Sequence, residues 1–259
     1  FDGNGHQITK LKITGGSYAG LFGNVLGATI QNCNVTGEVN GYNLTGGIVG
    51  YANDNTHILN CSFQGNVEGD GEERGGIVGH TSIGCEVSGC FVTGKVKGPE
   101  SVGGIAGWGA GKIKNCYALA DVTAAENSAG GIAGYAFGVT IENCYYSGNV
   151  SAKNYNYAGG IAGTALRGTI QNCVSLAESV TGSEYVNRIA GQVIGNTSLI
   201  NNHSYNRTKL VIDGKITYAD GTDKKDGTNV FVSAGRVMTD VQKGEVFDWA
   251  GFDRDIWSI

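Results

Sequence analysis

The side chains of this sequence that could perform chemistry are its carboxylates, imidazoles and thiols, and their spacing does not predict an active site. The first 203 residues contain four aspartates, Asp2, Asp54, Asp70 and Asp121. Glycosidic hydrolysis requires two carboxylates at a fixed separation, yet Asp54, Asp70 and Asp121 occupy unrelated positions in the repeat described below. The four histidines, at positions 6, 57, 80 and 203, are equally scattered. We therefore predict a protein that is not an enzyme, with no catalytic residues and no cofactor.

Acidic residues do gather just before the glycine-rich phrases of the repeat. They are Asp70, Glu72, Glu73, Glu100, Glu126 and Glu184. A charged turn discourages side-by-side association of β-structure, and a contact bridged by a cation is the alternative. An enzyme acting on polysaccharide, a lyase or hydrolase, is the competing class for the whole chain. A cluster of acids with a basic residue in one groove would favour it.

Six of the seven cysteines recur at a regular interval: Cys33, Cys61, Cys90, Cys116, Cys144 and Cys173. Equivalent residues on adjacent strands have parallel Cα–Cβ bonds and lie about 4.8 Å apart, whereas a disulfide needs Cβ atoms about 3.5–4.5 Å apart. We expect buried free thiols, with one or two strained bridges as the alternative. A linear row also lacks the tetrahedral convergence that zinc requires, so we predict no metal site. Cys85 lies outside the register and is expected to be exposed.

A row of variable residues follows each glycine-rich phrase: Asn24, Tyr51, His80, Trp108, Tyr135, Thr164 and Gln192. If it faces outward, the four rings of Tyr51, His80, Trp108 and Tyr135 form a flat strip that could stack on sugar rings or contact a partner protein. If it faces inward, the rings belong to the core. Alternation from the preceding aliphatic residue favours the outward orientation. These four residues are the candidate ligand-binding site.

The elements that position these residues come from an internal repeat. The phrase GGIVG or GGIAG occurs at 46–50, 75–79, 103–107, 130–134 and 159–163, and weaker copies are AGLFG at 19–23 and NRIAG at 187–191. Successive copies are 27, 29, 28, 27, 29 and 28 residues apart. A fixed period with one-residue variation is typical of a solenoid.

The composition of each copy favours strands. Glycine interrupts every copy, and Ile, Val, Thr and Tyr are frequent. In TIQNCNVTGEV (29–39), Ile30 would point inward, Gln31 and Asn32 would form a bend, and residues 33, 35, 37 and 39 would alternate with period two. Three short strands per copy make one circuit of a parallel β-helix, and the crossover rule makes it right-handed. The predicted fold is all-β: a right-handed parallel β-helix of about seven to eight coils with a C-terminal cap.

Two residue types have predicted structural roles in each coil. The leading glycines of the phrase should allow a sharp corner with backbone angles that a β-carbon forbids. Asparagines recur at the bend, at 32, 60, 115, 143, 172 and 201, with Gly89 as the exception. Their amides should bond the backbone at the bend and one another along the stack.

The repeat stops near residue 203, so we divide the chain into a β-helix, 1–203, and a capping segment, 204–259. The cap should contain a hairpin around Asp213–Gly214, a short amphipathic helix within 234–247 that places Val237, Met238 and Val241 on one face, and a Trp-rich tail. Trp249, Phe252 and Trp257 would plug the apolar end of the solenoid. Asp220, Asp223 and Asp226 are spaced by three, unlike an EF-hand loop, so calcium is not expected.

The overall composition excludes two classes of partner. The net charge is −5 and the 18 basic residues form no run, which argues against nucleic acid. No apolar stretch approaches the length of about 18 residues that spans a membrane. The chain begins at Phe1 without a signal-peptide pattern, and we interpret it as the mature or trimmed part of a longer precursor.

The repeated GG-[IL]-[VA]-G phrase, followed by an N-C bend and a V-x-G-x-V strand, resembles the GLUG-motif repeat proteins of bacteria. FDGNGHQITKLKI at the start is similar to the first coil of such β-helical surface proteins. The resemblance covers residues 1 to about 203. It implies a secreted or cell-surface bacterial protein and supplies no catalytic set.

We therefore predict a non-catalytic surface or secreted module, monomeric and adhesin-like. It would bind a host glycan or surface protein, or space other domains. A purely structural stalk is not distinguished from an adhesin by the sequence.

Overall fold

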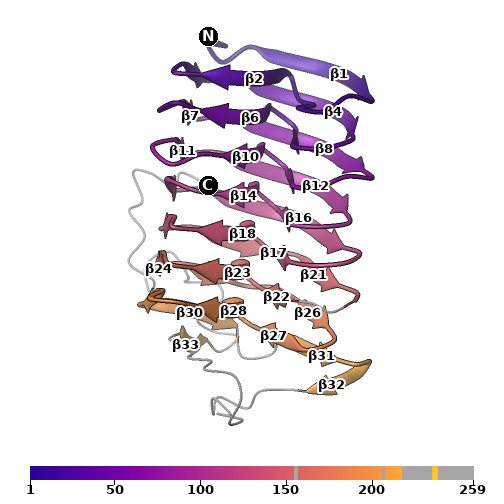
Figure 1. Cartoon of the computed structure of the whole chain (residues 1–259), viewed down its shortest axis with the longest axis vertical. Coiled ribbons are helices and arrows are strands. Elements are labelled where there is room, and N and C mark those ends of the chain that lie inside the picture. The colour runs from indigo at the N-terminus through magenta and orange to yellow at the C-terminus, as the bar shows by residue number, and fades with distance from the viewer. Residues whose placement is uncertain (155–156, 206–207, 218–234, 239–259) are drawn as a thin grey trace.

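The computed structural model describes residues 1–154, 157–205, 208–217 and 235–238, and every element among them is a β-strand (Figure 1). The strands form four sheets that run along the axis of a solenoid, and each coil after the first contributes to all four sheets in turn. The predicted all-β parallel β-helix is confirmed. In Figure 1 the nearer strands run to the left and the farther strands to the right as the chain descends from its N-terminus, which is a right-handed winding.

Sheet 1 holds the long strands of the coils and the strands that follow the last of them. It comprises β1 (Gln7–Thr14), β4 (Asn34–Gly41), β8 (Ser62–Gly69), β12 (Phe91–Gly98), β16 (Tyr117–Ala124), β20 (Tyr145–Ser147), β21 (Asn149–Ala152), β25 (Val174–Ser175), β26 (Ser179–Gly182), β30 (Asn202–Tyr205), β31 (Lys209–Ile212), β32 (Lys215–Thr217) and β33 (Gly235–Met238).

Sheet 2 carries the candidate site, and its seven strands mark seven coils. It comprises β2 (Phe22–Leu26), β6 (Val49–Asn53), β10 (Val78–Thr81), β14 (Ala106–Gly109), β18 (Ala133–Phe137), β23 (Ala162–Leu166) and β28 (Ala190–Ile194). Sheet 3 follows it in each coil and comprises β3 (Thr29–Gln31), β7 (His57–Leu59), β11 (Glu86–Ser88), β15 (Lys112–Lys114), β19 (Thr140–Glu142), β24 (Thr169–Gln171) and β29 (Ser198–Ile200).

Sheet 4 is the short sheet between sheets 1 and 2, and the sequence did not predict it. It comprises β5 (Thr45–Gly46), β9 (Arg74–Gly75), β13 (Val102–Gly103), β17 (Ala129–Gly130), β22 (Tyr157–Gly159) and β27 (Tyr185–Asn187). From the second coil on, each coil therefore has a strand in sheet 4 in addition to the three expected, because the start of the glycine phrase pairs with its neighbours instead of forming an unpaired corner.

The core is a set of rows parallel to the axis. Ile48, Ile77, Ile105, Ile132, Ile161 and Ile189 are at most 1% exposed and occupy the same place in successive coils. A second row on sheet 2 changes from Val49 and Val78 to Ala106, Ala133, Ala162 and Ala190, all buried. Burial of these aliphatic side chains is the main stabilising contribution.

The glycines of the phrase are required for space and not for unusual backbone angles, which corrects the prediction. The leading glycines, such as Gly130 and Gly131, do not have positive φ. A β-carbon on Gly131 would lie 2.2 Å from the carbonyl oxygen of Gly160 and 2.3 Å from Cγ of Tyr146. Neighbouring coils therefore approach too closely for a side chain at this position.

Positive φ recurs at the asparagine bend. Asn32, Asn60, Asn115, Asn143, Asn172 and Asn201 have φ between 49° and 54°, and Gly89 has φ 64°. Asparagine and glycine adopt this left-handed region most readily, which explains both the row and its exception. Stacked amides also bond one another, since Asn143 Nδ2 donates to Asn115 Oδ1 at 3.3 Å and Asn201 Nδ2 donates to Asn172 Oδ1 at 2.9 Å.

The parallel ladder continues past residue 203, because β30 pairs with β25 and β31 with β26. The predicted hairpin is confirmed: β31 and β32 are antiparallel, joined by Asp213 and Gly214 with φ of 48° and 73°. Gly235–Met238 form strand β33, paired with β30, where a helix was predicted. The rest of that segment, including Val241, lies outside the described residues, as do Asp220, Asp223, Asp226, Trp249, Phe252 and Trp257.

Candidate functional site

The four candidate side chains lie side by side on four successive strands of sheet 2. Tyr51 on β6 pairs in register with His80 on β10, His80 with Trp108 on β14, and Trp108 with Tyr135 on β18. All four are partly exposed, whereas the next residue along β6, Ala52, is buried. The row therefore faces outward, and we call it the aromatic row.

The ring geometry differs from the flat strip that the sequence predicted. Ring centroids are 5.0 Å apart between Tyr51 and His80, at an angle of 79°. His80 and Trp108 are parallel to within 2° at 5.8 Å, and Trp108 and Tyr135 lie 4.3 Å apart at 14°. Because the rings stack on one another along the axis, the faces of the middle rings cover each other and their edges turn to solvent.

His80 is held by an acidic residue of the preceding turn. Its Nδ1 lies 2.7 Å from Oε2 of Glu73, and both side chains are largely buried, with 22% and 13% exposed. Glu73 has φ of 60°, an uncommon angle for a residue with a β-carbon. At the next ring, the Tyr51 hydroxyl lies 3.0 Å from Ser82 Oγ. These contacts fix the rings at the N-terminal end of the row.

Two aromatic residues lie beside the row and were not predicted from the sequence. Tyr18 is 44% exposed and its ring lies 5.9 Å from Tyr51. Phe137 lies 6.1 Å from Trp108. Phe137 follows Tyr135 by two residues, so the strand period could have identified it. Tyr18 precedes AGLFG, the weak first copy of the phrase, and the repeat does not align it with any residue of the row.

The row ends at Thr164, the next position in register after Tyr135. Its hydroxyl lies 2.7 Å from Ser128 Oγ, and the side chain is buried. Asn24 and Gln192, which complete the row in the sequence, carry no ring. The aromatic part of the row is therefore four coils long.

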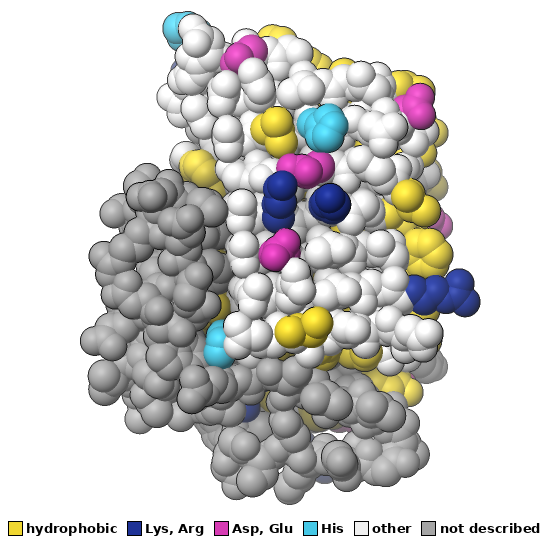
Figure 2. Space-filling view, turned by 90° about the vertical axis from the view of Figure 1, so that its left-hand side faces the viewer, with side chains coloured by type: hydrophobic (Ala, Val, Ile, Leu, Met, Phe, Trp, Pro, Cys, Tyr) yellow, Lys and Arg dark blue, Asp and Glu magenta, His cyan; other side chains and the backbone are white. Residues whose placement is uncertain are grey.

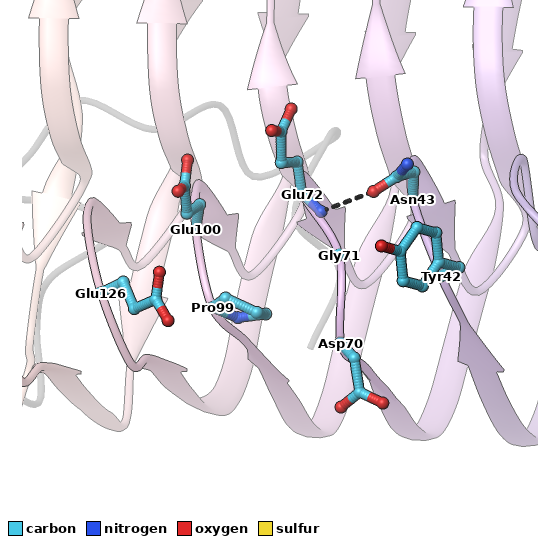
Figure 3. Close-up of a pocket in the computed structure, with 8 residues that line it drawn as sticks. All are labelled: Tyr42, Asn43, Asp70, Gly71, Glu72, Pro99, Glu100 and Glu126. Carbon is cyan, nitrogen blue, oxygen red and sulfur yellow. Dashed lines mark hydrogen bonds between the residues drawn. The ribbon is translucent and has the colours of Figure 1, made fainter.

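Four of the six acidic residues before the glycine phrases line a shallow hollow of about 270 Å³ (Figure 3). Its lining residues are Tyr42, Asn43, Asp70, Gly71, Glu72, Pro99, Glu100 and Glu126. The carboxylates drawn in Figure 3 point in different directions. In the described part of the chain, no group of three His, Cys, Asp or Glu side chains converges as a metal site would require. Glu184 is exposed and is not among the lining residues, and Glu73 contacts His80 instead.

A buried arginine supports the turn at this hollow. The Arg74 guanidinium is fully buried and donates hydrogen bonds to the carbonyl oxygens of Gly71 and Tyr42, the latter at 2.7 Å. Burial lowers the pKa of Arg74 to about 10, opposed by the charge of Asp70. Arg74 therefore remains charged at neutral pH and ties two coils together through their backbones.

All seven cysteines are free and buried, so the thiol row is confirmed. Cys85 is only 1% exposed, which corrects its predicted exposure, because its side chain turns inward and its thiol reaches the carbonyl oxygen of Ala52 at 3.4 Å. Burial raises the pKa of Cys33 to about 11 and raises those of Cys90 and Cys116 well above the usual value. Buried, protonated thiols are poor nucleophiles.

Sheet 3 presents a different surface, which faces the viewer in Figure 2. It carries charged side chains of both signs, and Lys114 Nζ lies 3.0 Å from Glu86 Oε1. On a neighbouring pair of strands, Gln171 Nε2 donates to Glu142 Oε1 at 2.9 Å. This face forms no stripe of one sign. No helix in the described residues is long and apolar enough to cross a membrane.

Comparison with known proteins identifies the repeat. Residues 41–68 and 98–123 match the family of the GLUG motif. The chain contains copies of the GLUG motif. Each match runs from the end of one sheet 1 strand, through the glycine phrase and the bend, into the next sheet 1 strand. The motif is therefore the sequence of one coil.

The GLUG β-helix also resembles a solved structure. It is 27% identical to a "putative immunoglobulin A1 protease" from Bacteroides ovatus, with a TM-score of 0.63, over 96% of this chain and 72% of that chain. Comparison with curated proteins gave no match.

Proposed function

We propose that this GLUG β-helix is a non-catalytic binding module of a secreted or cell-surface bacterial protein, and that it attaches to a host glycan or protein through the aromatic row. The observation that carries the proposal is the presence of four partly exposed rings on four successive strands of one sheet. Exposed aromatic groups in one place are typical of binding surfaces.

The distribution of reactive groups supports a binding role over an enzymatic one. The carboxylates at the hollow diverge, the thiols are buried and the Arg74 guanidinium lies in the interior, so the groove that would favour a polysaccharide lyase or hydrolase is not assembled from these residues. The location outside the cytoplasm rests on the resemblance of GLUG repeats to bacterial surface proteins.

The similarity to a protein described as an immunoglobulin A1 protease favours a second candidate, a role in proteolysis. Incubation of the purified chain with immunoglobulin A1 tests it by gel electrophoresis. Cleavage would replace the non-catalytic proposal, and intact antibody would leave the binding module in place.

The binding role is tested with arrays of glycans and of host surface proteins. The wild-type chain is compared with the triple variant Tyr51→Ala, Trp108→Ala, Tyr135→Ala. The matched control, Lys112→Ala, Thr140→Ala, Thr169→Ala, alters outward side chains of sheet 3 instead. Circular dichroism verifies that each variant folds. We expect binding that only the sheet 2 variant loses. Equal binding by all three proteins, or no binding to either array, would contradict the proposal.

A further inference from the structure

The edges of three successive rings each present a polar atom to solvent. Among the described residues, His80 Nε2, Trp108 Nε1 and Tyr135 Oη have no hydrogen-bond partner, and none of these atoms is buried. Their polar neighbours differ in this respect, because the Tyr51 hydroxyl contacts Ser82 and the Thr164 hydroxyl contacts Ser128. The row thus offers three available hydrogen-bonding atoms, one on each of three coils.

Glu73 orients the first of these atoms. A carboxylate accepts but cannot donate, so the short contact to Glu73 Oε2 places the proton of His80 on Nδ1. In the neutral ring, Nε2 is then an acceptor, while Trp108 Nε1 is a donor and Tyr135 Oη is both. A ligand must therefore supply donors as well as acceptors along its length, as a series of hydroxyl groups does.

The direction and spacing of the row restrict the shape of the ligand. The three residues are register partners on parallel strands, so their backbones follow one another along the solenoid axis at intervals of about 4.8 Å, and their ring centroids are 5.8 and 4.3 Å apart. An extended peptide presents equivalent groups about 6.6–6.8 Å apart, which does not match this interval. A hexose unit has a length similar to the rise of one coil along the solenoid axis. A linear chain of hexoses that lies along the axis therefore matches the spacing of the coils.

The charge around the row restricts the ligand further. Glu73 contacts His80 directly, four more acidic residues lie in the neighbouring turns at the hollow, and the net charge of the chain is −5. These charges repel an anionic ligand. The covered faces of Trp108 also leave no slot for a flat aromatic ligand.

We infer that the aromatic row binds an uncharged linear oligosaccharide that lies along the solenoid axis, one sugar unit to a coil, and is held by hydrogen bonds to the ring edges of His80, Trp108 and Tyr135. This inference rests on the proposed binding function. It differs from the usual stacking of a sugar on an open aromatic face, because here the ring edges make the contacts.

Variants that keep each ring and remove its polar atom test the inference. His80→Phe, Trp108→Phe and Tyr135→Phe retain the stack, and Tyr42→Phe, at a 58% exposed tyrosine of the hollow, is the matched control. The probes are neutral cello-, malto-, xylo- and manno-oligosaccharides from dimer to hexamer, measured by isothermal titration calorimetry. We expect wild-type affinity for one series to rise up to the trimer or tetramer. Each row variant should then lose about fivefold to tenfold, as the loss of one hydrogen bond implies, and the control should bind normally.

The outcomes separate this inference from the function on which it rests. Wild-type binding that the three Phe variants keep and the triple Ala variant loses would show contact with ring faces, and would overturn the inference. Binding only to an acidic glycan or to a protein would also overturn the inference while leaving the binding module intact. Absence of binding to any glycan or protein would contradict both the inference and the proposed binding function.

Discussion

The inner isoleucine row and the outer aromatic row lie three residues apart in every coil, yet they vary in different ways. The inner row is Ile in six coils and almost fully buried, since each side chain packs against its own equivalents above and below. The outer row reads Asn, Tyr, His, Trp, Tyr, Thr and Gln. Except for the buried Thr164, each outer residue meets solvent on one side, so packing restricts it less. In a solenoid, the residues that differ between coils are therefore the ones to search for function.

The largest effect should come from filling the space that the glycine phrase leaves between coils. In Gly131→Ala, the new β-carbon would meet the Gly160 carbonyl oxygen and the Tyr146 ring. We expect a loss of more than about 3 kcal/mol in the free energy of unfolding. This loss would exceed the cost of about 1–3 kcal/mol that is typical of an overpacked core. Urea denaturation measures it. Gly138→Asn is the control, because Gly138 has φ of 59° and a β-carbon there would have no close neighbour. Similar stability of the two variants would contradict this account of the phrase.

A direct comparison of the rows uses two truncations on the same coil. Ile132→Ala should cost about 3 kcal/mol, because it leaves a cavity in the core. Tyr135→Ala should cost about 1 kcal/mol, the contribution of one stacked ring pair at a partly exposed site. Thermal and urea unfolding of the two variants give the difference. A larger loss for Tyr135→Ala would mean that the outer row is part of the core.

The buried thiols should make the inner part of the fold sensitive to alkaline pH. Burial raises the pKa of Cys33 from 9.0 to about 11, so the unfolded chain loses this proton first as pH increases. The stabilisation is complete below pH 9 and decreases by about 2 kcal/mol as pH rises through 11. Urea midpoints between pH 7 and 11, under reducing conditions, measure the slope. The urea midpoint of Cys33→Ala should decrease less steeply with pH than that of the wild type. An unchanged pH dependence would contradict the assignment of this effect to Cys33.

The bend asparagine should have a smaller effect, which depends on backbone angle. Asn143→Ala places a β-carbon without an amide at φ of 52° and should cost about 1 kcal/mol. Asn143→Gly adopts that angle easily and loses only the 3.3 Å contact with Asn115, so it should stay within about 0.5 kcal/mol of wild type. If Asn143→Gly lowers the stability as much as Asn143→Ala does in differential scanning calorimetry, the amide stack determines the loss of stability and the backbone angle does not.

The smallest effect should be on the outer face of sheet 3. Lys114→Ala removes the 3.0 Å contact with Glu86 at a partly exposed site and should change the free energy of unfolding by about 0.5 kcal/mol or less. A double-mutant cycle with Glu86→Ala isolates the pair. A coupling well above that value would show that the charged face contributes to the fold.

The features that the sequence predicted are mainly those that recur from coil to coil. The period, the inner rows, the thiol row and the Asp213–Gly214 hairpin follow from spacing and residue type, so they could be identified without coordinates. Ring angles could not, because His80 and Trp108 share a register position but their side-chain torsions depend on neighbours such as Glu73. The role of Gly131 was misassigned for a related reason. The distance between backbones of adjacent coils is not a property of either coil alone.

The parallel pairing of every coil with the next also determines how the protein responds to force. The hydrogen bonds between coils run along the solenoid axis, so tension along that axis loads one coil at a time instead of shearing many strands together. A coil of 28 residues that peels away would add about 100 Å of extended chain. A solenoid of this kind would lengthen in steps under tension, and each coil that remains wound would keep its part of the outer surface intact.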